Sequence, residues 1–394
     1  MMKNFLNYVN EDYYLFEEKG QAIKHLTHLA GEEHFYGKDR AEADIDRLEN
    51  LHNYLKGEKS TVSRVGVKAD GSPAFQMGHV INPKTGEREF GVAYKGATKG
   101  YMFNQKDVDE SFGDKPGLHS KISQLVQHGG KVMSPIHGVV QGDFMGSKQD
   151  GTIFEDGDNI SHKEQLIKYS VPKNSDEGKK LKRSKISVAL HTKIDGDDRE
   201  YNIDTSKFYD HPDVHIFNNK FDRQKVNYDE DTQKEFEGHV SKAKEHLSQL
   251  RDHDGLVEGH SEHLQTYINK NVREGTDPTV QGYRSHLQTR LQKDVDKVKT
   301  PAVKQKKQDM LDGMLDHVDD NKDQFTTLFS AHKKLDQAKN VLLEKLEMSG
   351  QNQIHTINDH HAMPEGFVAG YQDGSVSKIV NRSAEGFSGL NLNK

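Results

Sequence analysis

The sequence contains no cysteine and no tryptophan among its 394 residues. Without cysteine the chain forms no disulfide, offers no thiolate nucleophile and builds no cysteine-ligated zinc site. It also lacks any apolar run of the about 20 residues that a membrane-spanning helix needs. Its first residues do not have the basic and then apolar order of a secretory signal. We therefore expect a cytoplasmic protein that does not enter a membrane.

Apolar side chains are scarce and charged ones are common. Hydrophobic residues make up 32% of the chain and charged residues 30%, and the net charge is −7. Such an acidic balance argues against a generally basic nucleic-acid binder, although a local basic path would suffice for phosphate contacts. Two basic clusters could supply that path, at 179–185 and at 297–307. We favour the first, because it directly precedes a predicted strand of the pocket described below.

The periodicity of the apolar residues divides the chain into regions. Residues 1–58 have the spacing of a helical segment, and residues 229–349 have that of a longer helical block. Between and after them, residues 59–228 and 350–394 carry strand patterns separated by Asp-Gly turns. We therefore predict an α+β fold in which antiparallel sheets with flanking helices are interrupted by a large helical insertion at 229–349.

The most informative motif is the run Lys68-Ala69-Asp70-Gly71, which follows the apolar strand pattern of 65–67. It presents an amine at a strand end, next to a carboxylate and to a glycine turn that a phosphate could approach. A lysine attacks an electrophile only as the free amine, so a nucleophilic Lys68 needs neighbours that adjust its pKa. A simple alternative is an exposed lysine before a hairpin turn.

Three further strand patterns carry polar residues of the same kind. The strand at 139–145 contains Gly142-Asp143, the stretch 90–97 ends an alternating strand in Lys95-Gly96, and the strand at 185–192 carries His191. Taken singly, these residues also fit a strand-end aspartate, an ordinary surface lysine and a structural histidine.

A last hairpin pattern closes the sequence. Glu365 lies near the start of the strand predicted at 364–371, and Lys378 lies in the strand at 376–380, after the turn at 372–375. The stretch 254–258 also has an acidic-Gly-x-Val pattern, but no lysine-bearing strand follows it. We therefore prefer Glu365 as the carboxylate of the site.

In this order, the motifs resemble those of the covalent nucleotidyltransferases, the superfamily of ATP-dependent nucleic-acid ligases and capping enzymes. The Lys-x-Asp-Gly-Ser form looks more like the RNA ligases, and the full set resembles tailed-phage proteins of that class. The sequence has Pro73 where DNA ligases and capping enzymes have arginine, and Val376 where a second lysine is usual.

The resemblance implies an ATP-dependent RNA ligase-like enzyme that uses ATP and Mg²⁺ in the cytoplasm of a bacterial host. Lys68 would form lysyl-AMP, with Asp70 and Lys378 as further catalytic groups. The nucleotide would contact Gly71, Lys95, Asp143, His191, Glu365 and Lys378, and Glu365 and Asp143 would hold the metal. The partner would be a nucleic acid, most simply RNA, with a 5′-phosphate end.

Two other functions fit the same residues. The nucleotide could pass to a protein or a small molecule, or the fold could serve a non-enzymatic phage structural or host-interaction protein. The sequence leaves open the choice between RNA and DNA, the choice between ATP and GTP, and the oligomeric state.

Overall fold

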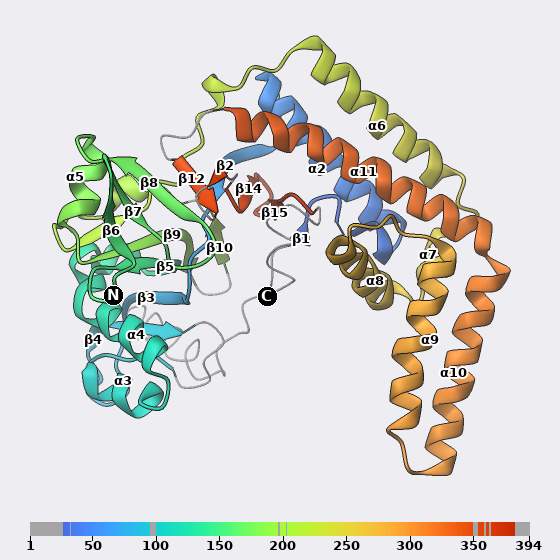
Figure 1. Cartoon of the computed structure of the whole chain (residues 1–394), viewed down its shortest axis with the longest axis horizontal. Helices are drawn as coiled ribbons and strands as arrows, with labels where there is room; N and C mark the ends of the chain where they lie inside the picture. The colour runs from blue at the N-terminus through green and yellow to red at the C-terminus, as the bar shows by residue number, and fades with distance from the viewer. Residues whose placement is uncertain are drawn as a thin grey trace, which may run out of the picture. The chain divides into compact units, whose positions relative to one another are not determined.

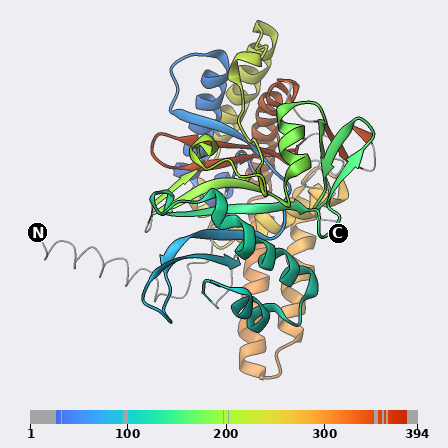
Figure 2. The ribbon, with the colours of Figure 1, turned by 90° about the vertical axis from the view of Figure 1, so that its left-hand side faces the viewer.

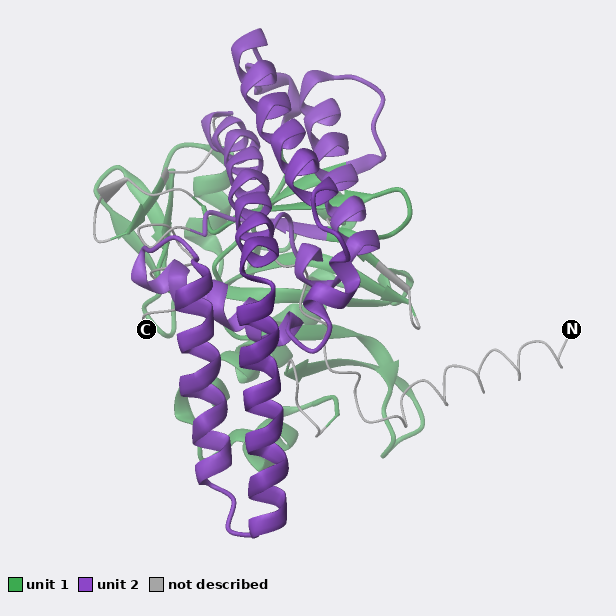
Figure 3. Cartoon of the chain, turned by 90° about the vertical axis from the view of Figure 1, so that its right-hand side faces the viewer, with its two compact units in different colours: residues 1–25, 64–221, 350–376 green, residues 26–63, 222–349, 377–394 purple. Residues whose placement is uncertain are grey.

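The computed structural model describes residues 27–31, 33–94, 100–195, 198–201, 203–349, 354–357, 360–361 and 364–382. The chain forms two compact units. Unit 1 contains residues 1–25, 64–221 and 350–376, and unit 2 contains residues 26–63, 222–349 and 377–394 (Figure 1, Figure 3). Each unit is therefore built from three separate stretches of sequence.

The main sheet of unit 1 has the strand order β10-β9-β5-β3-β4, with β11 beside β9. All of these neighbours are antiparallel except β9 and β11. The strands are β3 (Ala74–Ile81), β4 (Arg88–Tyr94), β5 (Val139–Ser147), β9 (Ile186–Asp195), β10 (Asp198–Tyr201) and β11 (Val214–Ile216). Figure 2 views the chain from the side of this unit, with β3 and β4 in blue to cyan.

The turn between β3 and β4 follows from its sequence. Asn82 N donates to the carbonyl of Glu87 at 2.8 Å, and its side chain accepts from Lys84 N at 3.0 Å. Gly86 has a φ of +74°, which glycine adopts without a steric penalty. Strands β3 and β4 therefore form an antiparallel hairpin.

Helices α3 (Gln105–Phe112) and α4 (Pro116–His128) pack against each other, and α4 also packs on β4 and β9. The core between helices and sheet is apolar, and includes Phe75, Met77, Phe144 and Leu125. This packing fixes β5, which carries Asp143.

A second antiparallel sheet of unit 1 has the order β13-β12-β8-β7-β6. Its strands are β6 (Ile153–Asp156), β7 (Asn159–His162), β8 (Lys168–Pro172), β12 (Ile354–Ile357) and β13 (His360–His361), and α5 (Asp176–Arg183) packs on it. β12 joins this sheet from the far end of the sequence, as expected for a sheet that resumes after a helical insertion.

Two more strands of unit 1 carry the lysine motif and its partner. β2 (Val62–Lys68) lies beside β14 (Gly366–Tyr371). After β14, a turn closed by Tyr371 N and Ser375 O at 2.9 Å leads to β15 (Val376–Ile379). β15 enters unit 2, where it pairs in parallel with β1 (Thr27–His28).

Unit 2 is mainly helical. Its helices are α2 (Lys38–Lys56), α6 (Glu230–Ser248), α7 (His253–Val257), α8 (Ser261–Glu274), α9 (Val280–Asp296), α10 (Pro301–Asp320) and α11 (Lys322–Met348). α11 packs along α6 and also on α2, while α9 and α10 pack as an antiparallel hairpin (Figure 1). One of its apolar clusters includes Tyr283, Phe325 and Phe329.

The predicted α+β class with antiparallel sheets is confirmed. Two local expectations need correction or restriction. The predicted helical segment 1–58 also contains the strand β1, next to which Leu29 N donates to the carbonyl of Lys378 at 2.8 Å. Residues 1–26 of that segment lie outside the described part. The stretch 254–258, the rejected alternative, lies largely in helix α7. Within the described ranges, we find no helix long and apolar enough to cross a membrane.

Candidate functional site

Lys68 is the last residue of β2 and forms an ion pair with Glu365, the residue before β14. The two side chains are only 23% and 15% exposed. β2 and β14 are neighbours in the sheet, so residues almost 300 positions apart in sequence meet at adjacent strand ends. The structure thus brings together two of the predicted site residues.

Asp70 fixes the turn that follows Lys68. Its carboxylate oxygen Oδ2 accepts hydrogen bonds from the backbone N–H groups of Leu166 at 2.8 Å and Ile167 at 3.1 Å. Its own N–H donates to the hydroxyl oxygen of Tyr169 at 2.6 Å. Asp70, which we predicted to be catalytic, is therefore bonded to β8 and to the residues just before it. These contacts are those of a residue that positions Lys68.

Gly71 lets this turn lie against β5. A Cβ atom at position 71 would be 2.8 Å from both the Cβ of Asp143 and the carbonyl oxygen of Phe144, closer than real side chains come. Next to it, Ser72 N donates to that same carbonyl at 2.8 Å, and Phe144 N donates to the carbonyl of Pro73 at 3.0 Å. The glycine is therefore required for the close approach that brings Asp143 to the lysine turn.

His191 reaches Asp143 because β9 contains a bulge. Gln141 is paired with Thr192 and Gly142 with Leu190, so His191 is an extra residue opposite that step. Its Nε2 lies 3.4 Å from Asp143 Oδ2, and its Nδ1 lies 2.7 Å from Thr192 Oγ1. The ring of His191 therefore lies against the carboxylate of Asp143, and its contact with the nucleotide stays a prediction.

The charges around Lys68 explain its ionisation. Burial alone would lower the pKa of the Lys68 ammonium, but the carboxylates of Glu365, Asp143 and Asp70 outweigh burial and raise it. Burial raises the pKa of Glu365, and the positive charge of Lys68 only partly offsets this. Three carboxylates thus surround one ammonium, and the resting lysine is held in its charged form.

This arrangement can accept a further cation. Carboxylate oxygens suit Mg²⁺, which usually binds one or two carboxylates together with substrate phosphates. In the part of the chain that the structure describes, no group of three or more His, Asp or Glu side chains is arranged to hold a metal on its own. Glu365 and Asp143, whose carboxylates both act on Lys68, are the residues that could hold such an ion.

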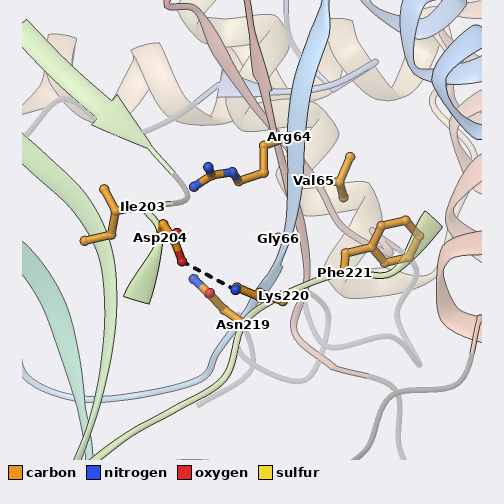
Figure 4. A pocket seen from close by; sticks show the side chains of 8 residues that line it. All are labelled: Arg64, Val65, Gly66, Ile203, Asp204, Asn219, Lys220 and Phe221. Carbon is orange, nitrogen blue, oxygen red and sulfur yellow. Dashed lines mark ion pairs between the residues drawn. The ribbon is translucent and has the colours of Figure 1, made fainter. Parts of the chain in front are cut away.

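A cavity of about 240 Å³ lies along the same strand. Figure 4 shows its lining, with Arg64 extended toward Ile203 and with Lys220 paired to Asp204 at 3.4 Å. Its eight lining residues are Arg64, Val65, Gly66, Ile203, Asp204, Asn219, Lys220 and Phe221. Since alternate residues of a strand share a face, Arg64 and Gly66 are on the Lys68 face of β2.

Sequence reasoning missed three residues of this neighbourhood, Arg64, Tyr169 and Lys220. Arg64 could have been found from its spacing of four residues before Lys68, which gives the same strand face. Tyr169, which holds the Asp70 turn, and Lys220, which bridges to Gly66 through the backbone, gave no comparable signal. Both belong to segments about 100 residues or more from the motif.

The structure does not test the predicted roles of two further residues. Lys95 lies outside the described residues. Lys378 lies on β15 in the part of the chain that belongs to unit 2, where its carbonyl accepts from Leu29 N. Their proposed contacts with phosphate stay predictions.

Comparison with known proteins gives a family without an assigned activity. No curated protein and no solved structure matches the chain. One family model, described as a family of unknown function (DUF6267), matches residues 23–394. This match includes every residue of the Lys68 cluster and nearly the whole chain, and the protein therefore belongs to the DUF6267 family.

Proposed function

We propose that the protein is an ATP-dependent nucleotidyltransferase in which Lys68 accepts the nucleotide, and that it acts as an RNA ligase. The observation that carries this proposal is the convergence of Lys68, Asp143 and Glu365 in unit 1 from three distant segments. The order of the motifs that led to these residues adds support. A surface lysine before an ordinary turn would not need this surrounding set of carboxylates.

In the proposed reaction, the amine nitrogen of Lys68 forms a bond to the α-phosphorus of ATP while the bond to the pyrophosphate oxygen breaks. The products are lysyl-AMP and pyrophosphate. The ammonium must first lose a proton, and Glu365 is the nearest base. Burial has raised the pKa of its carboxyl group, which makes it a better proton acceptor than an exposed glutamate.

The other groups position the reactants. Asp70 holds the turn, and His191 holds Asp143 toward the site. A bound Mg²⁺ would neutralise the charge that develops on the phosphates. In a ligase the AMP then passes to a 5′-phosphate, and a 3′-hydroxyl displaces it to join the two ends.

The charged state of Lys68 favours one alternative. The Lys68 amine is paired with the Glu365 carboxylate, and the surrounding carboxylates raise the pKa of Lys68. A purely structural ion pair has the same two features. The second candidate is therefore a non-enzymatic structural or host-interaction protein on the same fold.

Incubation with ATP labelled at the α-phosphate, in the presence of Mg²⁺, distinguishes the two candidates. We expect the unchanged full chain to form a covalent adduct. The Lys68→Ala variant should form none, and the Lys173→Ala variant should still form it. Lys173 is a matched control because it is a half-buried lysine of unit 1 that pairs with a different carboxylate, Glu155, at 2.6 Å. If no adduct forms with any of the four common nucleotides, the non-enzymatic candidate is favoured.

The acceptor is tested in a second step. We expect 5′-phosphorylated RNA to remove the label from the protein and to become sealed to a 3′-hydroxyl end. Transfer of the label to a protein or a small molecule, with no sealing, would contradict the ligase and keep the nucleotidyltransferase.

A further inference from the structure

The two basic clusters of the sequence have different surroundings in the structure. In the cluster at 179–185, every basic side chain has an acidic partner within 4 Å. The pairs are Lys179 with Asp176, Lys180 and Arg183 with Asp210, Lys182 with Glu155, and Lys185 with Asp213. This cluster, which the sequence favoured as a phosphate path, is neutralised by its own unit.

The second cluster lies at the end of the α9–α10 hairpin, which we call the hairpin tip and define as residues 290–307. It contains seven lysines and arginines and two aspartates, a net charge of +5 in a chain of net charge −7. Within the described residues, Lys299, Lys304 and Lys306 have no ion-pair partner, whereas Lys297 pairs with Asp294 at 3.1 Å. Most of the positive charge of the tip is therefore available.

The tip is also accessible. Residues 299–307 are all exposed, and Val303 and Met310 are large apolar side chains that remain in solvent nearby. Figures 1 and 3 show the hairpin projecting beyond the other helices of unit 2. The buried side chains nearest to this exposed stretch are Val295 on α9 and Leu311 on α10.

Folding of the hairpin does not account for these lysines. Lys293 and Lys297 at the end of α9 complement that helix dipole, but the lysines in the first two turns of α10 oppose the dipole of their own helix. Other helices of unit 2, such as α6 and α11, have aspartate or glutamate in their first turn, and α10 has none. The lysines of α10 therefore have an electrostatic cost that a polyanionic partner would offset.

We propose that the hairpin tip binds the phosphate backbone of a polynucleotide. The inference rests on the proposed function for the choice of partner, because a ligase must hold a strand in addition to its nucleotide. Lysines distributed around both arms of the tip fit a backbone that is contacted at several successive phosphates. A membrane-binding helix would instead carry a broad apolar face opposite its lysines, and this region exposes only the two large apolar side chains named above.

The test compares two triple variants of the full chain. One is Lys299→Gln/Lys304→Gln/Lys306→Gln in the tip, and the matched control is Lys179→Gln/Lys180→Gln/Lys182→Gln. Fluorescence anisotropy with a labelled single-stranded RNA of about 20 nucleotides measures affinity at several salt concentrations. Circular dichroism checks that both variants are folded.

We expect the tip variant to bind about tenfold more weakly or worse, with a salt slope smaller by about 2, since each lost phosphate contact on a single strand removes about 0.7. We expect the control to bind within about threefold of the unchanged chain. Equal loss in both variants, or an unchanged salt slope in the tip variant, would overturn the proposal.

Two other probes test other partners. Phosphatidylserine vesicles and polyglutamate carry negative charge without a sugar-phosphate backbone. If either one binds through the tip more tightly than the RNA, the partner is a membrane or an acidic protein and the proposal is wrong.

The adduct experiment distinguishes a failure of RNA binding at the tip from a failure of the proposed nucleotide transfer to Lys68. The tip variant should still form the nucleotide adduct, because Lys68 is unchanged. Lys68→Ala should lose the adduct and still bind RNA. RNA binding without an adduct in the unchanged chain would contradict the proposed function alone.

Discussion

Each unit buries a pair of titratable side chains, and the two pairs differ in how they are charged. In unit 1, Lys68 and Glu365 form an ion pair in which the lysine is held charged by three carboxylates. In unit 2, His332 Nδ1 lies 3.0 Å from His34 Nε2, and burial is the largest cause that lowers the pKa of both rings. In unit 1 the three carboxylates outweigh burial and the lysine is charged, whereas at His332 the nearby Asp336 and Asp277 do not outweigh burial and the pKa is lowered. The proposed function assigns its charged substrate to the charged pair.

Breaking the charged pair should have the largest effect. Lys68→Met leaves the Glu365 carboxylate buried without its cation, so we expect unit 1 to lose about 3 kcal/mol or more of its free energy of unfolding at pH 8. Lys68→Met/Glu365→Leu, which removes both charges, should regain most of this stability. Urea unfolding measures both variants, and a double variant no more stable than the single one would contradict the ion-pair explanation.

The neutral pair predicts sensitivity to acid. The pKa of His332 is lowered to about 4, so between its ordinary value of 6.5 and pH 4 the unfolded chain binds more protons than the folded one. Stability at this contact therefore falls as the pH falls below 6.5, by about 3 kcal/mol in total at pH 4.

Hydrogen exchange of the α11 amides at 328–335 reports this contact locally. The local measurement is needed because unit 1 has its own buried histidine, His162, whose pKa is also lowered by burial. His332→Phe should make the exchange of these amides less dependent on pH. An equal pH dependence in this variant would show that other groups cause the effect.

Gly71→Ala tests how the charged pair is positioned. The added Cβ would collide with the Cβ of Asp143 and the carbonyl of Phe144, so the turn must shift, at a cost of about 2 kcal/mol in unit 1. We expect loss of the nucleotide adduct with little change in the exchange of α11. Substitution at Gly157, whose added Cβ would meet nothing within 4 Å but which has a φ of +56°, should cost stability without loss of the adduct.

Thr279→Ala should have the smallest effect and should be confined to unit 2. The Thr279 side chain accepts from Gly282 N at 3.1 Å and caps α9, and such caps contribute about 1 kcal/mol. Thermal unfolding should show this small loss, while adduct formation at Lys68 remains unchanged. A large loss of the adduct would mean that the two units are not separable in function.

The strands around the site could be predicted because their patterns are local. The alternation before Lys68, the Gly-Asp strand of β5 and the closing β14–β15 pattern each depend on a few adjacent residues. Gly71 could also be identified as the glycine of the turn after Lys68, whereas its close approach to Asp143 could not.

The contacts of the site residues could not be predicted, because they depend on register and on distant segments. Glu365 meets Lys68 only because β14 lies next to β2, and His191 faces Asp143 only because of a bulge in β9. The preference for the cluster at 179–185 as a phosphate path failed for the same reason, because most of the acidic residues that pair with it are distant in the sequence. Asp210 and Asp213 pair with three of its five charges, those of Lys180, Arg183 and Lys185, and lie more than 25 residues away in the sequence.

Localisation of the nucleotide by mass spectrometry tests the central claim most directly. After incubation with ATP and Mg²⁺, tandem mass spectra of the digested chain should place AMP on the side chain of Lys68 and on no other lysine. A chain that stays unmodified, or one modified at another lysine while Lys68 is untouched, would contradict the account.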